Sequence, residues 1–185
     1  MIEIVWQDIV GDPKEWTDKY SGDATDPTNL IERLSVQGSP TELGVVEVYE
    51  IARTKSRRRA SLVKHNDDGL VRALTRIALD TDLTMSEQVR ISILTALHGV
   101  RIPTASAILS WSKPNVWPVI DRRAWAALAD LGLVDAGRAS RLSAVDWEEY
   151  CRIVLPAAAS LNWTPQKFDR WLYGYARDRG LGATP

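Results

Sequence analysis

The residues best suited to chemistry lie in one stretch of the chain, from Leu94 to Trp125. Within it, Asp121 stands directly before a segment whose residues favour a helix. An aspartate in this position commonly caps the helix, because its carboxylate accepts hydrogen bonds from the first backbone amides. A carboxylate fixed at a helix N-terminus can also stabilise positive charge in a transition state, or activate a water molecule. The two roles are compatible, and the position of Asp121 taken by itself favours the cap alone.

Upstream of Asp121, the sequence LTALHGVRIPTASAIL at residues 94–109 predicts two short helices joined by a tight turn. Gly99 permits the positive φ that such a turn requires, and Pro103 stands where a second helix would begin. We expect Val100 to fill the joint between the helices. The first amides of the second helix have no partner within it, so together with the helix dipole they predict a phosphate site.

This run resembles the helix-hairpin-helix motif of the HhH-GPD superfamily of base-excision DNA glycosylases. That motif has the form hydrophobic-x-Gly-hydrophobic-Gly, followed by a helix with an early alanine. The matching residues are Leu97, Gly99, Val100 and Ala105. Arg101 stands at the second glycine, where its side chain can reach phosphate itself. Asp121 stands at the distance from the hairpin at which the family carries its aspartate.

The resemblance implies an all-α, DNA-glycosylase-like fold, in which Asp121 stabilises oxocarbenium-like charge on the deoxyribose or activates the attacking water. Family members that also cleave the DNA backbone carry a lysine early in the second hairpin helix, where this chain has Pro103. The resemblance therefore implies a monofunctional enzyme that hydrolyses the N-glycosidic bond of a damaged or modified base. Cys151 is the only cysteine, so we expect no iron–sulfur cluster, as in poorly characterised bacterial members, and no cofactor.

DNA is the expected partner, bound through its phosphates at the hairpin, after Asp121 and along the basic run at residues 53–64. The expected contact residues are Leu97, His98, Gly99, Val100, Arg101, Thr104, Arg122, Arg123, Lys55, Arg57, Arg58 and Arg59. Other interpretations stay open: the basic run as a solvated helix face, His98 as a polar turn residue, and Arg122 or Arg123 as a surface residue or a partner that keeps Asp121 ionised.

A base flipped out of DNA needs aromatic walls, and the chain contains 8 tryptophans. Those near the candidate site are Trp111, Trp117 and Trp125. We predict Trp117, in the loop beside Pro118, as the best candidate for a pocket wall. The alternative is that all three belong to the hydrophobic core, since Trp125 and Leu128 have helical spacing.

Helix signals recur along the chain, and only Met1–Val10 is expected to be extended. The predicted helix starts are a capping box at residues 39–42 for a helix to about Thr54, Asn66 or Asp67, a capping box at residues 84–87, Asp121, Ser143, and Thr164 with Pro165. For the helix after Asp67, the predicted buried face contains Leu70, Leu74, Ile77 and Ala78.

Length and charge set the remaining expectations. The 185 residues fit one helical domain over residues 1–185. That domain can divide into two lobes, about 28–120 with the hairpin at 87–112, and 1–27 plus 121–185. Without an apolar membrane span or a signal peptide, we expect a cytoplasmic, nucleoid-associated protein. With one cysteine and two histidines, no metal site is expected.

The net charge of −1 argues against a dedicated DNA-binding protein, which is usually basic. Two alternatives to a glycosylase are therefore kept. The first is a non-catalytic nucleic-acid-binding module that retains the fold, and the second is an interaction protein in which the fold is a relic.

Overall fold

The computed structural model describes residues 5–10, 28–35 and 40–182, and every regular element in these ranges is helical. The prediction of an all-α chain is confirmed for this part. The α-helices are α1 (Trp6–Val10), α3 (Thr28–Ser35), α4 (Val45–Lys55), α5 (Arg57–Val63), α6 (Asp68–Leu79), α7 (Glu87–Thr95), α8 (Ile102–Ser112), α9 (Arg122–Asp130), α10 (Ala144–Ser160) and α11 (Pro165–Asp178), with a short 3-10 helix, η1, at Ala136–Arg138.

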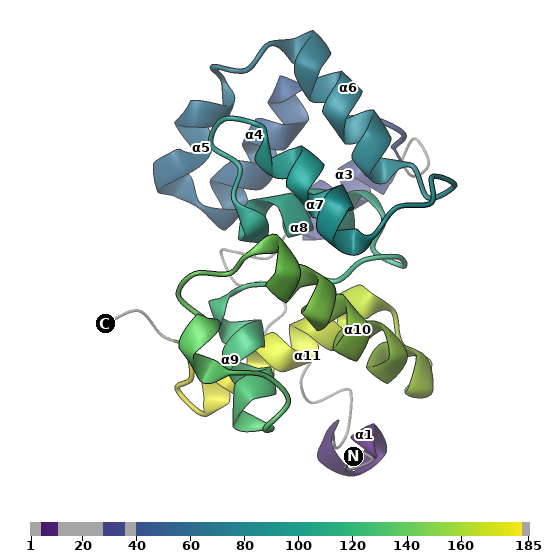
Figure 1. The fold of residues 1–185 in the computed structure, drawn as a ribbon, viewed down its shortest axis with the longest axis vertical. Coiled ribbons are helices and arrows are strands. Elements are labelled where there is room, and N and C mark those ends of the chain that lie inside the picture. Colours follow the sequence, from purple (N-terminus) through teal and green to yellow (C-terminus); the bar gives the residue numbers. More distant parts are fainter. Residues whose placement is uncertain (1–4, 11–27, 36–39, 183–185) are drawn as a thin grey trace.

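The helices form two groups, one above the other in Figure 1. Helices α3 to α8 lie in the upper group, and α9, α10 and α11 lie in the lower group with α1 beside them. One hydrophobic cluster runs through both groups, from Val48 in α4 through Ile108 in α8 to Phe168 in α11. No helix in the described ranges is both long and apolar enough to cross a membrane.

Local capping chemistry sets most helix starts. The carboxylate of Asp67 accepts a hydrogen bond from the Leu70 amide at the start of α6. Ser143 caps α10 and Thr164 caps α11 in the same way, each through its side-chain oxygen. These predicted starts are confirmed, because each depends only on residues within one helical turn.

Two predicted starts are wrong. Helix α4 begins at Val45, after Gly44, whose amide donates to the Glu47 carboxylate at 3.0 Å. Helix α7 begins after Ser86, whose hydroxyl accepts from the Val89 amide at 3.2 Å. Glu42, predicted to cap α4, instead pairs with Arg72 and Arg76 of α6, and Ser39 lies outside the described residues.

Two further expectations are wrong. Trp6–Val10 forms helix α1 rather than an extended segment, and residues 1–4 lie outside the described ranges. In α6 the buried face contains Val71, Thr75, Ala78 and Leu79, whereas Leu70 and Ile77 are 47% and 41% exposed. The buried Thr75 hydroxyl explains the choice of face, because it accepts from the Leu43 amide at 2.9 Å and joins α6 to the segment before α4.

Candidate functional site

A tight turn at residues 96–101 joins α7 to α8 and packs against α5. Gly99 has a φ of +87°, which favours glycine. A Cβ atom at Gly99 would lie 2.9 Å from the Leu62 Cβ and 3.0 Å from the Val63 amide nitrogen. The turn can approach α5 this closely only because residue 99 has no side chain.

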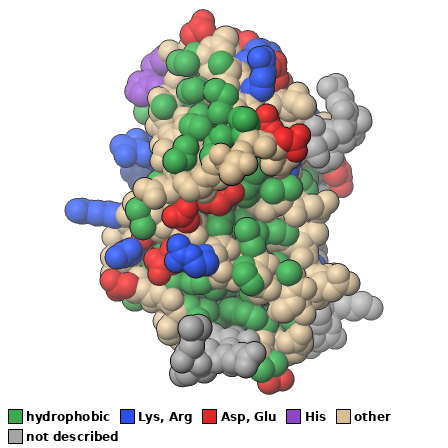
Figure 2. Space-filling view, turned by 45° about the vertical axis from the view of Figure 1, so that its right-hand side comes forward, with side chains coloured by type: hydrophobic (Ala, Val, Ile, Leu, Met, Phe, Trp, Pro, Cys, Tyr) green, Lys and Arg blue, Asp and Glu red, His purple; other side chains and the backbone are tan. Residues whose placement is uncertain are grey.

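Asn66 fixes the tip of the turn. Its side-chain amide donates to the His98 carbonyl at 3.0 Å, and its side-chain oxygen accepts from the His98 amide at 2.8 Å. The His98 ring is exposed, with its centroid 5.9 Å from that of His65. Figure 2 shows the two histidines together at one edge of the molecule, with lysine and arginine side chains below them along that edge. His98 is thus a polar turn residue whose main chain is already held.

The start of α8 carries no side-chain cap, and its N-cap residue is Arg101. Among the described residues, the backbone amides of Arg101 and Ile102 donate to no acceptor, whereas those of Thr104 and Ala105 both donate to the Arg101 carbonyl. Open amides at the positive end of a helix attract anions. The Arg101 side chain is exposed at the same end.

A pocket of about 890 Å³ opens at this helix start. Four arginines from separate segments line it: Arg59 of α5, Arg101 of the turn, Arg122 of α9 and Arg141 before α10. No acidic side chain from the described parts of the chain lines it. Guanidinium groups pair with phosphate oxygens in a bidentate way, so the arginine pocket suits a phosphate-bearing ligand.

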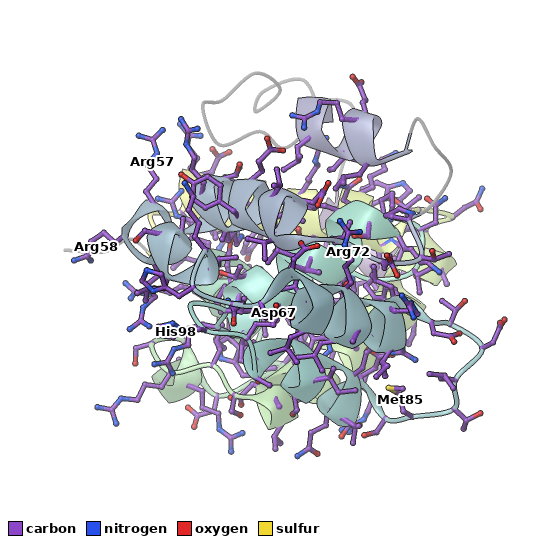
Figure 3. The ribbon with its side chains drawn as sticks, turned by 90° about the horizontal axis from the view of Figure 1, so that it is seen from above. Arg57, Arg58, Asp67, Arg72, Met85 and His98 are labelled. Atoms are coloured by element: carbon purple, nitrogen blue, oxygen red, sulfur yellow. The ribbon has the colours of Figure 1, made fainter. Side chains whose placement is uncertain are left out.

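Several predicted DNA contacts lie elsewhere. The side chains of Leu97 and Thr104 are buried, because they fill the joint between α7 and α8. The prediction that these two side chains touch DNA is therefore wrong. Val100 is also buried there, as expected of a residue that fills the joint, and it also lines the pocket. Arg57 and Arg58 project away from α5 on the same side as His98 (Figure 3) and do not line the pocket.

Asp121 uses its two carboxylate oxygens for different partners. Oδ1 caps α9 by accepting hydrogen bonds from the amides of Arg123 at 2.9 Å and Ala124 at 3.0 Å. Oδ2 accepts from the Lys55 Nζ at 2.8 Å, and both side chains are half-buried, 22% and 18% exposed. The predicted cap is confirmed, and the partner of the carboxylate is Lys55.

This ion pair changes the expected roles of two cations. Lys55, predicted to contact DNA, is turned inward against Asp121 because its amine would otherwise be buried without a partner. Arg123 is also engaged inside the molecule: its guanidinium donates to the Tyr173 hydroxyl at 3.1 Å and lies 5.2 Å from the centroid of that ring. Both cations therefore have partners inside the molecule, and their contacts with phosphate stay predictions.

Ser106 of α8 positions the segment that leads to Asp121. Its hydroxyl oxygen accepts from the Ile120 amide at 3.1 Å. Ser106 lies one turn after Pro103 and is fully buried, so this contact ties the hairpin helix to the residue before the aspartate. Asp121 and the start of α8 are held in a fixed relation by the protein core.

A second carboxyl, Asp169 of α11, belongs to the same group of side chains. The Tyr150 hydroxyl of α10 donates to Asp169 Oδ1 at 3.2 Å. Burial and the negative charge of Asp121 raise the pKa of Asp169 to about 8. Burial also raises the pKa of Tyr150 well above its ordinary value, and the charges of Asp169 and Asp121 add to that shift.

The pKa values of the ion pair move in opposite directions. Burial alone would raise the pKa of Asp121, but the charge of Lys55 and the hydrogen bonds from Lys55, Ala124 and Arg123 outweigh burial and lower it. Burial alone would lower the pKa of Lys55, but the negative charges of Asp121 and Asp169 raise it. At neutral pH the carboxylate is therefore ionised and the amine is protonated.

The three tryptophans near the site belong to the core. Trp111, Trp117 and Trp125 are all buried, so the ring of Trp117 has no open face to serve as the predicted pocket wall. The buried guanidinium of Arg90 lies 5.1 Å from the Trp117 ring centroid. The Trp125 indole nitrogen donates to the Asp135 carbonyl at 2.8 Å. The alternative considered from helical spacing, a core role, is what the structure shows.

Three residues of the site were not predicted from the sequence: Tyr150, Asp169 and Arg141. The one available signal for Asp169 is its place in an amphipathic helix, next to the buried Phe168 and three positions before the buried Leu172. A carboxylate among buried residues needs compensation, which marks it as unusual. Arg141 carries no such signal, because it lies in a polar connection before α10.

Comparison with known proteins adds no relatives: the chain matches no protein-family model, no curated protein and no solved structure. The chemistry of the site therefore has to come from its own residues. Those residues form two adjoining parts: the arginine pocket at the start of α8, and a cluster of Lys55, Asp121, Tyr150 and Asp169. Arg122, the residue directly after Asp121, lines the pocket and joins the two parts.

Proposed function

We propose that the chain is a DNA-glycosylase-like protein with a helix-hairpin-helix fold, which hydrolyses the N-glycosidic bond of a damaged or modified base. The observation that carries this proposal is the position of an ionised carboxylate, Asp121, one residue before Arg122 of the arginine pocket. When a base leaves, positive charge develops on the deoxyribose, and a fixed carboxylate stabilises it. The pocket would hold the phosphates that flank the flipped nucleotide.

The state of Lys55 supports hydrolysis without a lyase step. A lysine acts as a nucleophile only when its amine is unprotonated. The charges of Asp121 and Asp169 raise the pKa of Lys55, so its amine stays protonated and balances the carboxylate. Pro103, at the hairpin position where an attacking lysine would be expected, has no amine either.

The test is a screen for base release from duplex and single-stranded oligonucleotides that carry deaminated, alkylated, oxidised or hypermodified bases. Asp121→Asn is the decisive variant, since asparagine also caps helices well but carries no charge. We expect base release to fall by at least about a hundredfold, the scale of one electrostatic contact to a transition state, while DNA binding persists. Asp67→Asn, the same change at the N-cap of α6, is the matched control. Base release that survives Asp121→Asn rules out this role.

A non-catalytic nucleic-acid-binding module is the second candidate. Both oxygens of Asp121 already have protein partners, which is also what a purely structural carboxylate would show. This candidate predicts salt-dependent DNA retention that Arg101→Ala abolishes, with no base released from any substrate. A wild-type protein that retains no DNA at low salt would exclude both candidates.

A further inference from the structure

Side chains from three helices and one helix cap form the cluster that adjoins the arginine pocket through Arg122: Lys55 at the end of α4, Asp121 before α9, Tyr150 in α10 and Asp169 in α11. Each is buried or half-buried. Their charges act on one another, since Asp121 affects the pKa of Lys55, Tyr150 and Asp169. The cluster therefore behaves as one electrostatic unit.

The cluster holds two carboxyl groups and one amine. Lys55 is hydrogen-bonded to Asp121, and Asp121 also accepts two backbone amides. Asp169 makes no ion pair with another described residue, and its one hydrogen bond there comes from the neutral hydroxyl of Tyr150. A negative charge on Asp169 would be half-buried, close to the charge of Asp121 and without a hydrogen-bonded cation among the described residues, which is costly.

We propose that Asp169 carries the proton of the cluster at neutral pH and donates it to the departing base, as the acid partner of the Asp121 carboxylate. This inference rests on the proposed function. Hydrolysis of a bond to an anomeric carbon commonly uses such a pair, one carboxylic acid for the leaving group and one carboxylate for the charge or the water. Lys55 distinguishes the two carboxyls, because it forms a hydrogen-bonded ion pair with Asp121, at 2.8 Å, whereas it acts on Asp169 only through its charge.

The bond between C1′ and the base nitrogen breaks with its electron pair on the base, which takes the proton from Asp169. The oxygen of a water molecule bonds to C1′, and its proton passes to Asp121. The products are the free base and a sugar hydroxyl, and transfer of the proton from Asp121 to Asp169 restores the starting state.

The electrostatics of the four groups agree with this assignment. Burial and the charge of Asp121 raise the pKa of Asp169 to about 8, against the opposing effects of Lys55, Tyr150 and Arg170. The pKa of Asp121 is lowered. Two carboxyls whose surroundings separate their pKa values in this way are typical of an acid and base pair.

The first experiment needs no substrate. Carboxyl carbons of 13C-labelled aspartate are titrated by NMR in the wild type, in Asp169→Asn and in Asp130→Asn. We expect one resonance with a midpoint near the pKa of about 8, absent from Asp169→Asn and present in Asp130→Asn. Asp130 is a matched control, because its carboxylate, like that of Asp169, accepts a hydrogen bond from a tyrosine hydroxyl, that of Tyr175 at 2.8 Å. Titration of every aspartate near the ordinary pKa of about 4 overturns the proposal.

The second experiment tests donation to the base. Asp169→Asn is assayed on duplexes that carry uracil or hypoxanthine, which leave as neutral bases after protonation, and on N7-methylguanine, which is already cationic. Loss of a general acid predicts a fall of about 100-fold or more for the neutral bases, a fall below about 10-fold for N7-methylguanine, and loss of the wild type's decline in rate at alkaline pH.

The outcomes separate the two proposals. Equal losses on both kinds of base mean that Asp169 only supports the structure, and they overturn its role as donor while the glycosylase remains. A wild type that releases no base from any of these duplexes or from the wider screen overturns the proposed function, and the donor role with it, even where the NMR titration shows the proton on Asp169.

Discussion

The carboxylate of Asp121 divides its oxygens between a helix cap and an ion pair, and the two can be separated by substitution. Oδ1 contacts the amides of α9, and Oδ2 contacts Lys55. Asparagine retains the first contact and loses the charge of the second. Replacing Lys55 does the opposite: it keeps the cap and leaves the carboxylate without its cation.

Lys55→Met is therefore expected to destabilise the protein by about 2 kcal/mol, since a half-buried charge loses its hydrogen-bonded partner. Urea unfolding at pH 7 measures the change in the free energy of unfolding. Arg58→Met is the matched control, because Arg58 is exposed on α5 and its loss should cost little. The double variant Lys55→Met with Asp121→Asn should recover part of the loss. Equal stability of Lys55→Met and Arg58→Met contradicts a contribution from the ion pair.

Asp169 makes the stability depend on pH in the direction opposite to most aspartates. Its pKa in the folded protein, about 8, lies above the unfolded value of about 3.9. The folded state then binds more protons, so its stability is highest below the unfolded pKa and declines as pH rises toward the folded one. Between pH 5 and 7 the wild type should lose about 1.4 kcal/mol per pH unit relative to Asp169→Asn. Parallel stability curves for the two proteins over this range would falsify the assignment.

At the scale of elements, the contact between the turn at residues 96–101 and α5 shapes the arginine pocket. It brings Arg59 and Arg101 to the lining of one pocket, and it exists because residue 99 has no Cβ. Gly132 offers a matched comparison: it also has a positive φ, +75°, but nothing lies within 4 Å of a Cβ built there.

Gly99→Ala should lower the free energy of unfolding by about 2 to 3 kcal/mol, from the strained φ and the collision with α5. Gly132→Ala should cost about 1 kcal/mol, from the φ alone. Thermal unfolding measures both, and the difference between them is the contribution of the close approach. Similar losses for the two variants mean that the turn can move away from α5 at no cost.

Helix boundaries could be predicted from the sequence wherever the capping contact is local. Asp67, Asp121, Ser143 and Thr164 bond to amides within their own first turn, and all four starts were predicted. The start of α4 was not predictable, because Glu42 contacts arginines of α6 that follow it by 30 residues or more. A capping pattern does not say whether a distant cation competes for the same carboxylate.

At the scale of the whole molecule, the site also contains residues that a local pattern predicts and residues that only distant contacts bring together. Asp121, Arg101 and Arg122 were predicted because the hairpin and the aspartate follow each other along the chain. The partnership of Lys55 with Asp121 spans 66 positions, and Asp169 enters only when α11 packs against α9. No local pattern encodes these contacts, so the electrostatics of the cluster required the tertiary fold.

The net charge of −1 and the arginine pocket make different predictions for DNA binding, and salt dependence distinguishes them. The pocket concentrates four arginines without an acid among its described lining residues, so affinity should come from a few phosphate contacts despite the acidic remainder. Each phosphate contact contributes about 0.9 to the slope of log K against log salt. Arg101→Ala should therefore reduce the slope for duplex binding by about 0.9. Arg76→Ala, which removes an exposed arginine of α6 paired with Glu42, should leave the slope unchanged. Equal slopes for Arg101→Ala and the wild type would show that the bound phosphates lie outside the pocket.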